Sequence, residues 1–437
     1  MKSRWTDLVV CLSFTGVLSF LIPTSFPELT VSSAWGDDDY RQLFPKNATV
    51  TTLITTPRSI EGLTGDNHDN LYTGGWGTSP CPVWKINVHK PSLVPVGFIQ
   101  SAENCILLGI AFNENGDLFV ADGLAGIVYT FTPNSQTPPS AVIFASAPGA
   151  NSMAFDKKGN LWLTDGTTGQ GRVWKITGPG ANCTSTPAIN CEEVFRVQPM
   201  ANEVNLNAAG VGGVGRDVRV LPQGMITVTP TSRNAADTLA SQPLVANGIA
   251  FDKSGDTLFI ADTARGAIWK ATFSPDGDLK SKTGCDTTFT PNTLCLDNVF
   301  VAHPYLESAD GIVLDQGENI WVSLPERQAI VVVTKNGKVI EVFRNPVNLP
   351  SVVYGQGLRN TGEQSVGNNR ILESPTVPFL AGKVFCTAQD DTGRRDNSPR
   401  REGEVSGGQP QDGPIPLAKI SCIDQELKIP GLRLPID

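Results

Sequence analysis

An internal repeat limits the fold of this sequence more than any other feature. Four segments align with one another, and each contains three short apolar runs separated by turns, the first of which carries a Gly or Asn. The four copies are LGIAFNENGDLFVADGLAGIVYTF from Leu108, NSMAFDKKGNLWLTDGTTGQGRVWKI from Asn151, NGIAFDKSGDTLFIADTARGAIWKATF from Asn247 and DGIVLDQGENIWVSLPERQAIVVV from Asp310. More divergent copies begin at Glu61 and Glu373, so we count six units in all.

A weaker fourth apolar run completes the unit, as in VIEVF at 339–343. Six such units predict an all-β fold, a six-bladed β-propeller of four-stranded antiparallel blades around a central channel. A lone blade cannot bury both of its faces, so we expect residues 35–437 to form a single domain. Residues 200–246 and 389–416 exceed the repeat, and we expect both to be loop insertions over one end of the propeller.

The N-terminus has the order of a secretory signal peptide. Lys2 and Arg4 precede an apolar run over 8–22, and small residues follow up to Ala34. This order predicts a signal peptide over 1–34, with an uncleaved membrane anchor as the alternative. We therefore expect a secreted or periplasmic, extracytoplasmic protein.

The cysteines support export. Of the nine, Cys11 lies in the predicted signal peptide, and the other eight fall into four sequence-close pairs. Two of these pairs bracket turn-rich segments that would otherwise be loosely held. Spacing alone does not fix the connectivity, but it favours the local pairs Cys81 with Cys105, Cys183 with Cys191, Cys285 with Cys295, and Cys386 with Cys422.

The charge balance argues against nucleic acid as a partner. The 437 residues include 34 Lys and Arg against 43 Asp and Glu, a net charge of −9, and we find no block of Lys or Arg. A surface for phosphate backbones needs clustered positive charge. No segment after the signal peptide is apolar for long enough to span a bilayer, so we expect no membrane partner after cleavage.

The first residue of each repeat is the strongest candidate for function. The innermost strand of every blade lies beside the channel, so the residues that begin these strands should meet in one ring. In chain order they are Glu61, Leu108, Asn151, Asn247, Asp310 and, less clearly aligned, Glu373 or Ser374. Carboxylate and carboxamide oxygens are ligands that hard cations prefer. The pattern therefore predicts one divalent cation held by Glu61, Asn151, Asn247 and Asp310.

A channel entrance that holds only ordered water is the alternative interpretation. The metal site is favoured because these four polar residues stand at equivalent positions of their repeats, whereas the residues that follow them are mostly apolar.

The repeats resemble those of the SMP-30/gluconolactonase/LRE-like superfamily of six-bladed propellers, of calcium-dependent phosphotriesterase and lactonase type, over essentially the whole mature chain. In that family a Glu in the first blade, an Asn in the fourth and an Asp in the fifth bind one divalent cation. Glu61 in EGL, Asn247 in NGIAFD and Asp310 in DGIVLD match these motifs. Asn151 in NSMAFD matches a further Asn that contacts substrate or metal-bound water. The resemblance favours calcium, with zinc, magnesium and manganese as alternatives.

The sequence also departs from this family and from related propellers. Some sugar lactonases carry an Arg two residues before the third-blade Asn, where this chain has Gly149, so an aldonolactone substrate is not favoured. Related paraoxonases use histidines at the channel mouth. Here His68, His89 and His303 lie in or next to turns or beside Pro304, and we expect them to be surface or structural residues.

These features favour a secreted metal-dependent hydrolase of a lactone or related ester, with a small molecule as substrate. The cation would polarise the carbonyl group and lower the pKa of bound water. Asp310, or Glu61, would take the proton as general base, and Asn151 would orient the water or the developing oxyanion.

The alternative is a non-catalytic secreted propeller that binds a ligand and uses the cation only for structure. Lyase-like or synthase-like relatives on the same fold are a third class. We can assign no Ser, Cys or His nucleophile, so the sequence does not decide between an enzyme and a binding protein.

Overall fold

The computed structural model describes residues 48–198 except 103 and 167, the strands at 216–220 and 226–230, residues 245–344 except 288, 307 and 326–328, residue 372, and residues 375–389 and 418–434. The signal peptide predicted for 1–34 lies outside the described residues. So do most of the insertion predicted for 200–246 and all but Gln389 of the insertion predicted for 389–416.

Six four-stranded antiparallel blades form the β-propeller that the repeat predicts. The first blade consists, from the channel outward, of β2 (Thr64–Gly65), β3 (Asn70–Gly74), β5 (Cys81–Asn87) and β6 (Val94–Ile99). The second consists of β8 (Leu107–Phe112), β9 (Leu118–Asp122), β10 (Ile127–Phe131) and β11 (Val142–Ser146). The third consists of β12 (Ala150–Phe155), β13 (Leu161–Asp165), β14 (Arg172–Ile176) and β16 (Cys191–Arg196).

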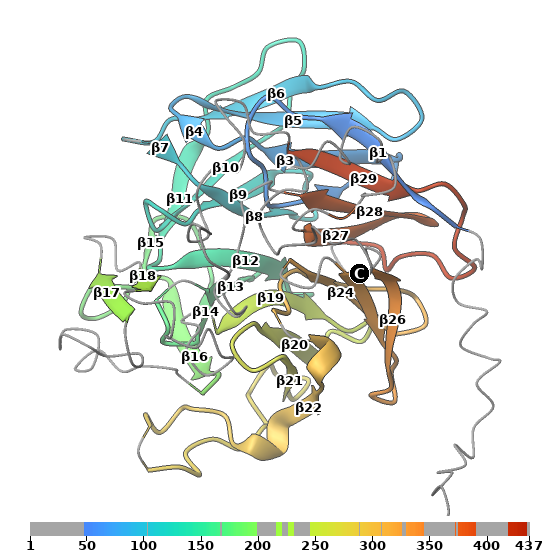
Figure 1. Ribbon diagram of the computed structural model, residues 1–437. Coiled ribbons are helices and arrows are strands. Elements are labelled where there is room, and N and C mark those ends of the chain that lie inside the picture. The colour runs from blue at the N-terminus through green and yellow to red at the C-terminus, as the bar shows by residue number, and fades with distance from the viewer. Residues whose placement is uncertain are drawn as a thin grey trace, which may run out of the picture.

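The second half of the ring repeats this order. The fourth blade consists of β19 (Ala246–Phe251), β20 (Thr257–Asp262), β21 (Ala267–Thr272) and β22 (Val299–Ala302). The fifth consists of β23 (Ile312–Leu314), β24 (Ile320–Leu324), β25 (Ala329–Val333) and β26 (Val339–Arg344). The sixth consists of β27 (Pro375–Ala381), β28 (Val384–Gln389), β29 (Lys419–Ile423) and β1 (Val50–Thr55). Figure 1 shows the inner strands β8, β12, β19 and β27 gathered around the middle of the molecule.

The two ends of the chain meet in the sixth blade and close the ring. Its outermost strand, β1, comes from the N-terminal part of the chain and pairs antiparallel with β29 near the C-terminus, with Val50 opposite Ile423. Asp424 reinforces this closure by accepting hydrogen bonds from the amide (2.8 Å) and hydroxyl (2.6 Å) of Thr49. The closed ring leaves no inner face of a blade uncovered.

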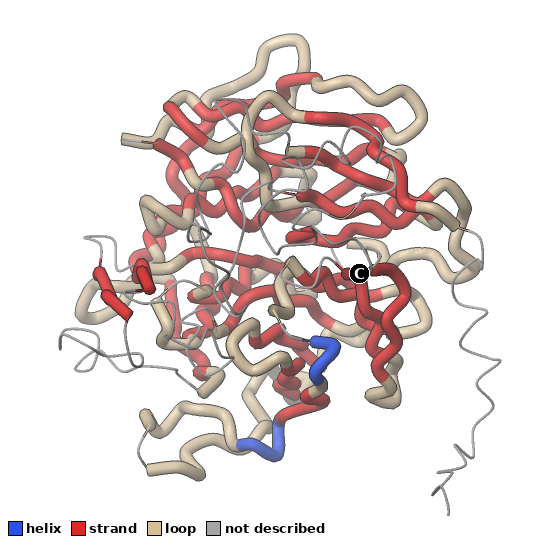
Figure 2. The backbone as a smooth tube through the Cα atoms, in the orientation of Figure 1, coloured by secondary structure: helices blue, strands red, loops and turns tan. Residues whose placement is uncertain are grey.

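Short elements extend this framework. β15 (Ala181–Asn182) adds parallel to β11, β4 (Gly77–Thr78) pairs with β7 (Asn104–Cys105), and β17 (Arg216–Val220) forms a hairpin with β18 (Ile226–Pro230) inside the first insertion. In the described part of the chain the helices are two short 3₁₀ turns, η3 (Leu296–Asn298) and η4 (Pro304–Leu306), so strands dominate Figure 2. No helix among these residues has the length and apolar character needed to cross a membrane.

Apolar side chains fill the spaces between blades, and a repeated turn fixes several of them. One core cluster joins Trp162 and Phe195 of the third blade to Phe251 and Leu258 of the fourth. In three blades an Asp between the first two strands accepts hydrogen bonds from an Asn four residues later and an aromatic side chain six residues later. These triplets are Asp66, Asn70 and Tyr72; Asp156, Asn160 and Trp162; and Asp315, Asn319 and Trp321. The indole and phenol groups can therefore be buried with their polar atoms satisfied.

The four predicted disulfides are confirmed: Cys81–Cys105, Cys183–Cys191, Cys285–Cys295 and Cys386–Cys422. Cys386 and Cys422 lie directly opposite each other in β28 and β29. Their disulfide therefore lies in the blade that closes the ring.

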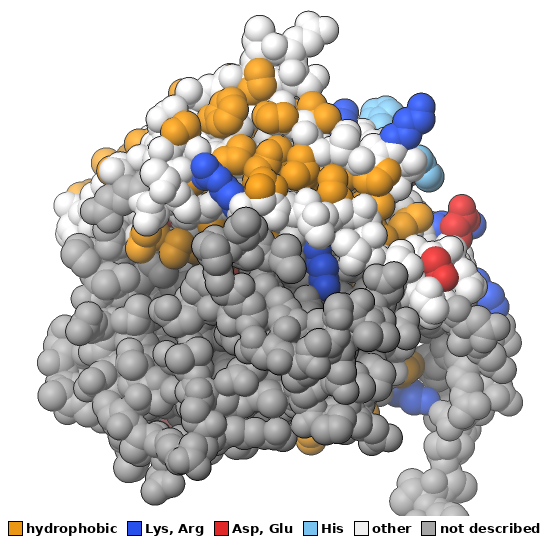
Figure 3. All heavy atoms as spheres, turned by 45° about the horizontal axis from the view of Figure 1, so that its top comes forward, with side chains coloured by type: hydrophobic (Ala, Val, Ile, Leu, Met, Phe, Trp, Pro, Cys, Tyr) orange, Lys and Arg blue, Asp and Glu red, His pale blue; other side chains and the backbone are white. Residues whose placement is uncertain are grey.

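One outer face of the propeller is poor in charge. Figure 3 shows hydrophobic side chains gathered on the face at the top of Figure 1, where Lys and Arg side chains lie singly. The outer strand β11 also exposes two large apolar side chains, Val142 (63%) and Ile143 (61%). A surface of this kind lacks the clustered positive charge that a nucleic acid backbone requires.

We predict that the Cys386→Ala/Cys422→Ala double variant is destabilised more than Cys183→Ala/Cys191→Ala. The sequence separations are 36 and 8 residues, and loop-closure entropy in the unfolded chain then makes the first disulfide worth about 1 kcal/mol more than the second. Denaturant unfolding of the two variants and the wild type measures the difference. If both variants lost the same free energy of unfolding, the disulfide in the closing blade would stabilise the protein no more than the Cys183–Cys191 disulfide does.

Candidate site at the channel ring

The inner strands of neighbouring blades approach so closely that their backbones touch at one end of the channel. The amide of Gly248 donates to the carbonyl of Asp310 (3.0 Å), and the amide of Gly311 donates to that of Thr376 (2.8 Å). In four blades the residue that begins the repeat is followed by Gly, because a Cβ there would overlap the carbonyl oxygen of the next blade. These glycines are Gly62, Gly109, Gly248 and Gly311. The residues that precede them form part of a closed ring.

Four of the ring residues lie where the inner strands bulge. The register of β8, β12, β19 and β27 shifts between Leu107 and Ile110, Ala150 and Met153, Ala246 and Ile249, and Pro375 and Pro378. A bulge re-aims a side chain away from the regular pleat. The six ring residues, in blade order, are Glu61, Leu108, Asn151, Asn247, Asp310 and Thr376.

Thr376 corrects the alignment of the sixth repeat. The sequence favoured Glu373 or Ser374, which lie outside the described residues, but the bulge in β27 and the bond from Gly311 place Thr376 at the ring position. Its hydroxyl donates to the carbonyl of Glu61 (2.9 Å) and so joins the sixth blade to the first. The sequence missed it because no short-range pattern reveals the bulge.

The two ring carboxamides are in direct contact. Asn151 Nδ2 donates to Asn247 Oδ1 (2.9 Å), and Asn247 Nδ2 donates to the hydroxyl of Thr263 (3.0 Å). Thr263 itself donates to the carbonyl of Ala309 (2.6 Å). Because its single proton is used there, the hydroxyl can only accept from Asn247. Thr263 therefore fixes the Asn247 amide with its oxygen turned toward Asn151.

Both ring carboxylates are buried. Asp310 is 1% exposed and Glu61 is 2% exposed. The amide of Asp310 donates to the carbonyl of Ser323 (3.0 Å), while its own carbonyl accepts from Gly248. The fourth and fifth blades thus hold Asp310 on both sides. The structure brings Asn151 and Asn247 into side-chain contact, and it brings Glu61 and Asp310 to the same ring through backbone bonds.

Asn151 packs on a compact turn of the third blade. Gly166 lies against its side-chain amide, where any Cβ would overlap Nδ2. Gly149, at the position where some relatives carry Arg, has φ of 68° and lies over Asp165 Oδ1. A side chain at 149 would be strained and would overlap that carboxylate, so this turn requires Gly.

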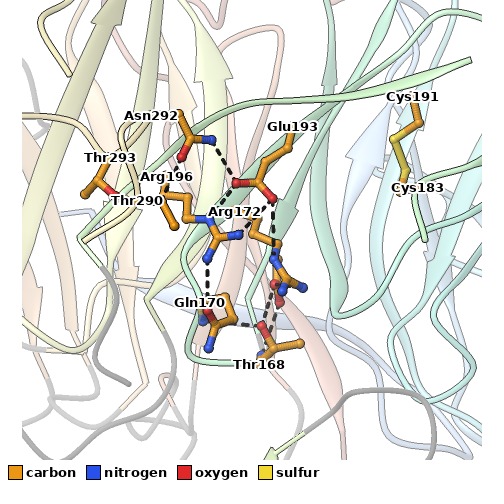
Figure 4. Close-up of polar contacts among 11 residues, drawn as sticks. Thr168, Gln170, Arg172, Cys183, Cys191, Glu193, Arg196, Thr290, Asn292 and Thr293 are labelled. Atoms are coloured by element: carbon orange, nitrogen blue, oxygen red, sulfur yellow. Dashed lines mark hydrogen bonds and ion pairs between the residues drawn. A yellow bond between two sulfur atoms is a disulfide. The ribbon is translucent and has the colours of Figure 1, made fainter. Parts of the chain in front are cut away.

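A polar network extends from this turn to the fourth blade (Figure 4). Thr168 donates its hydroxyl to the fully buried Asp165, and Arg172 lies 3.6 Å from the same carboxylate. Burial raises the pKa of Asp165 to about 6, while Arg172 and Thr168 act to lower it. This carboxyl is thus more easily protonated than an exposed Asp.

Further out, Arg196 binds Glu193 (2.5 and 3.0 Å) and Gln170 (3.0 Å). Glu193 also accepts from Asn292 (2.8 Å), which lies in the loop closed by the Cys285–Cys295 disulfide. Hydrogen bonding by Arg196 and Asn292 outweighs burial and lowers the pKa of Glu193. The network ties the fourth-blade loop to the blade that carries Asn151.

The ring opens onto a cavity inside the propeller. Asn151, Asn247 and Asp310 line one end of it, and the unfilled space amounts to about 900 Å³ with its open parts included. None of the three histidines lines this cavity. His68 is exposed, His89 lies 3.3 Å from Asp69 on the surface, and the ring of His303 packs on Tyr305.

Carboxyl groups alone are too few at the ring to make a cation site. Among the described residues, no three His, Cys, Asp or Glu side chains come together in a way that could hold a metal ion. A cation at the ring would therefore need the oxygens of Asn151 and Asn247 as well as the two carboxylates. Chemically, the ring offers two carboxyl groups and two carboxamides, and Asn151, Asn247 and Asp310 of this set line the end of the cavity.

We predict that Thr263→Val is less stable than Thr263→Ser. Valine keeps the shape but leaves the Asn247 amide and the Ala309 carbonyl without their bonds to the hydroxyl, at a cost of about 1–3 kcal/mol. Serine keeps the hydroxyl and is the matched control. Urea unfolding of both variants is the measurement, and equal stabilities would show that this hydroxyl does not hold Asn247.

Sequence comparisons give the relatives of this propeller. Residues 200–360 match the family model described as SMP-30/Gluconolactonase/LRE-like region. The chain is 22% identical over 297 residues to the lactonase drp35 of Staphylococcus aureus (strain MW2), covering 64% of this chain and 82% of that protein.

Solved structures with similar backbones include a calcium-binding protein, regucalcin, from Agrobacterium tumefaciens. It is 12% identical, covers 88% of this chain and 95% of its own, and has a TM-score of 0.44. A luciferin-regenerating enzyme is 10% identical, covers 88% of this chain and 98% of its own, and also has a TM-score of 0.44. The sequence matches, together with the six-bladed fold, support a relationship of this chain to the SMP-30/gluconolactonase/LRE-like superfamily.

Proposed function

We propose that this protein is an extracytoplasmic, metal-dependent hydrolase of a lactone or related ester. The observation that supports the proposal is the contact between the buried Asn151 and Asn247 side chains, which line one end of an internal cavity together with Asp310. The match of residues 200–360 to the SMP-30/gluconolactonase/LRE-like model and the similarity to a lactonase support the same reaction class.

The ring fits one hard divalent cation, with calcium favoured. Glu61 and Asp310 would supply negative charge, and Asn151 and Asn247 would supply neutral oxygens, which is a donor set suited to calcium. All four side chains are 5% exposed or less, so a cation there would be largely shielded from solvent. When bound, such a cation polarises a carbonyl group and makes water more acidic.

The chain's own residues would then divide the work. Asn151 would orient the substrate carbonyl or the attacking water, since its amide is already held by Asn247 and by the turn at Gly166. Asp310 would accept the proton from water as general base, which requires that it bind the cation only loosely. Thr263 would act as a positioning residue, because it orients Asn247 without reaching the cavity itself.

An extracytoplasmic location fits the four disulfides, which persist in oxidising compartments. It also fits the predicted signal peptide over 1–34, and the remaining chain, 35–437, would then be a single propeller domain with two insertions. The second candidate function is a non-catalytic binding propeller. It is favoured because the described residues that line the cavity include no His or Cys, and Ser152 is the one Ser among them.

We predict that Asp310→Asn separates these functions. The amide keeps an oxygen of similar shape but removes a charge, so calcium affinity measured by titration calorimetry should fall. It also cannot accept a proton, so hydrolysis across a panel of lactones and aryl esters should fall about 10²–10⁴-fold. At saturating calcium, occupancy should recover while turnover does not.

Asp297→Asn, an exposed carboxylate of η3, is the matched control and should leave both measurements unchanged. Full recovery of turnover in Asp310→Asn at high calcium would assign Asp310 to metal binding alone. A calcium-loaded wild type that hydrolyses no lactone or ester, and loses nothing to a chelator, would favour the binding propeller.

A further inference from the structure

The channel beyond the ring is apolar along its length. The cavity continues from the ring along the inner strands of all six blades. Aliphatic and aromatic residues dominate its walls, among them Ile110, Phe112, Phe155, Ile249, Phe251 and Phe379. Asp310 at the ring is the sole charged side chain among the described residues that line it. Polar recognition is therefore concentrated at one end.

Small side chains keep the channel open. Ala111, Ala154 and Ala250 stand at equivalent positions of the second, third and fourth blades, and each lines the cavity. They retain partial exposure although they lie on innermost strands. In the third blade, for example, the lining residues run from Asn151 to Phe155, and four residue steps along a strand span about 13 Å. The channel is thus long, and the close approach of neighbouring inner strands keeps it narrow at the ring.

The C-terminal segment lies at the far end. Leu432 donates its amide to the carbonyl of Leu314 (3.0 Å), at the end of β23 away from the ring, and Gly431 donates to Gly382 (2.7 Å) in the turn after β27. Leu432 and Leu434 line the apolar channel, and they also line a second cavity on the other side that includes Asp66 and Asp69. These leucines therefore form the wall between an apolar channel and a more polar pocket.

We propose that the channel binds the straight apolar chain of the substrate, so that the substrate is an alkyl-substituted lactone or a medium-chain ester whose carbonyl group lies at the ring. This inference rests on the proposed function of the ring. A sugar lactone would place hydroxyl groups against Ile and Phe side chains, where they would lose hydrogen bonds. A substrate without sugar hydroxyl groups also agrees with Gly149, where no Arg side chain can stand. An extended alkyl chain needs no polar partner and fits a long, narrow lumen.

The test separates binding from hydrolysis. Straight-chain alcohols from butanol to decanol have no carbonyl group to hydrolyse, and titration calorimetry on the purified full chain measures their affinity. Each added methylene group buried in the channel should tighten binding about fourfold. The increase in affinity with each methylene group should stop at the chain length that reaches Leu432. In Leu432→Ala, which lengthens the space, it should stop at a longer chain.

Two variants should block the channel. Ala250→Leu and Ala154→Leu place a larger side chain on the channel wall without changing a ring residue, and each should abolish the gain with chain length. Ala188→Leu, on the exposed surface of the Cys183–Cys191 loop, is the matched control and should behave as wild type. Circular dichroism and thermal melting identify any variant that fails to fold, and the other blocking variant then decides.

The outcomes distinguish the two proposals. Alcohol affinity that does not depend on chain length, or that folded blocking variants leave unchanged, would overturn the channel proposal, because the lumen would then hold only water. Chain-length-dependent binding without hydrolysis of any alkyl lactone would support the channel and overturn the hydrolase. Suppose instead that lactones are hydrolysed at a rate independent of alkyl length and that alcohol affinity does not change with chain length. This result would support the hydrolase and overturn the channel proposal.

Discussion

The close approach of neighbouring inner strands at the channel is the constraint on which this structure depends. Six blades can surround a narrow channel only if their first strands come within backbone contact, and the chain meets this demand with Gly62, Gly109, Gly248 and Gly311. The third blade and the sixth, where Val377 follows Thr376, are the exceptions, and the third blade shows how the contact is then made. There Ser152 takes the place of Gly, and its hydroxyl accepts from the amide of Ile249 (3.3 Å). At that same junction the side chains of Asn151 and Asn247 make the link across the ring.

This crowding also explains why the ring can hold polar groups in fixed orientations. Each ring residue has little freedom, because its backbone is bonded to the next blade or lies against it. Hydroxyl groups behind the ring then complete the hydrogen bonds: Thr164 donates to the carbonyl of Asn247 (2.7 Å), and Thr263 fixes the Asn247 amide. Fixed dipoles of this kind favour charge at a defined place without reorganisation, which is what binding a cation or stabilising an oxyanion requires.

Much of the fold could be predicted because its signals are local. Short apolar runs, glycines in turns and close cysteine pairs each act within one blade, and the six blades and four disulfides follow from them. The aspartates at the ends of second strands also behave locally: Asp122 accepts from the amides of Leu124 (3.2 Å) and Ala125 (3.3 Å), as expected for an Asp before a turn. The sixth ring residue could not be predicted, because the bulge that brings Thr376 to the ring depends on how β27 pairs with β28 and on contact with the fifth blade.

The sequence by itself determined the number of blades and the oxygen-bearing residues that begin the first, third, fourth and fifth repeats, because repeats and residue types are written in the chain. It favoured the local disulfide pairs, which the structure then established. Only the tertiary structure decided that Asn151 and Asn247 bond to each other, that Thr263 orients one of them, and that Gly149 leaves no room for a substrate-binding side chain. It also decided that the C-terminal leucines lie at the far end of an apolar channel. These are relations between residues distant in the chain, and they exist only once the ring has closed and brought the six inner strands together.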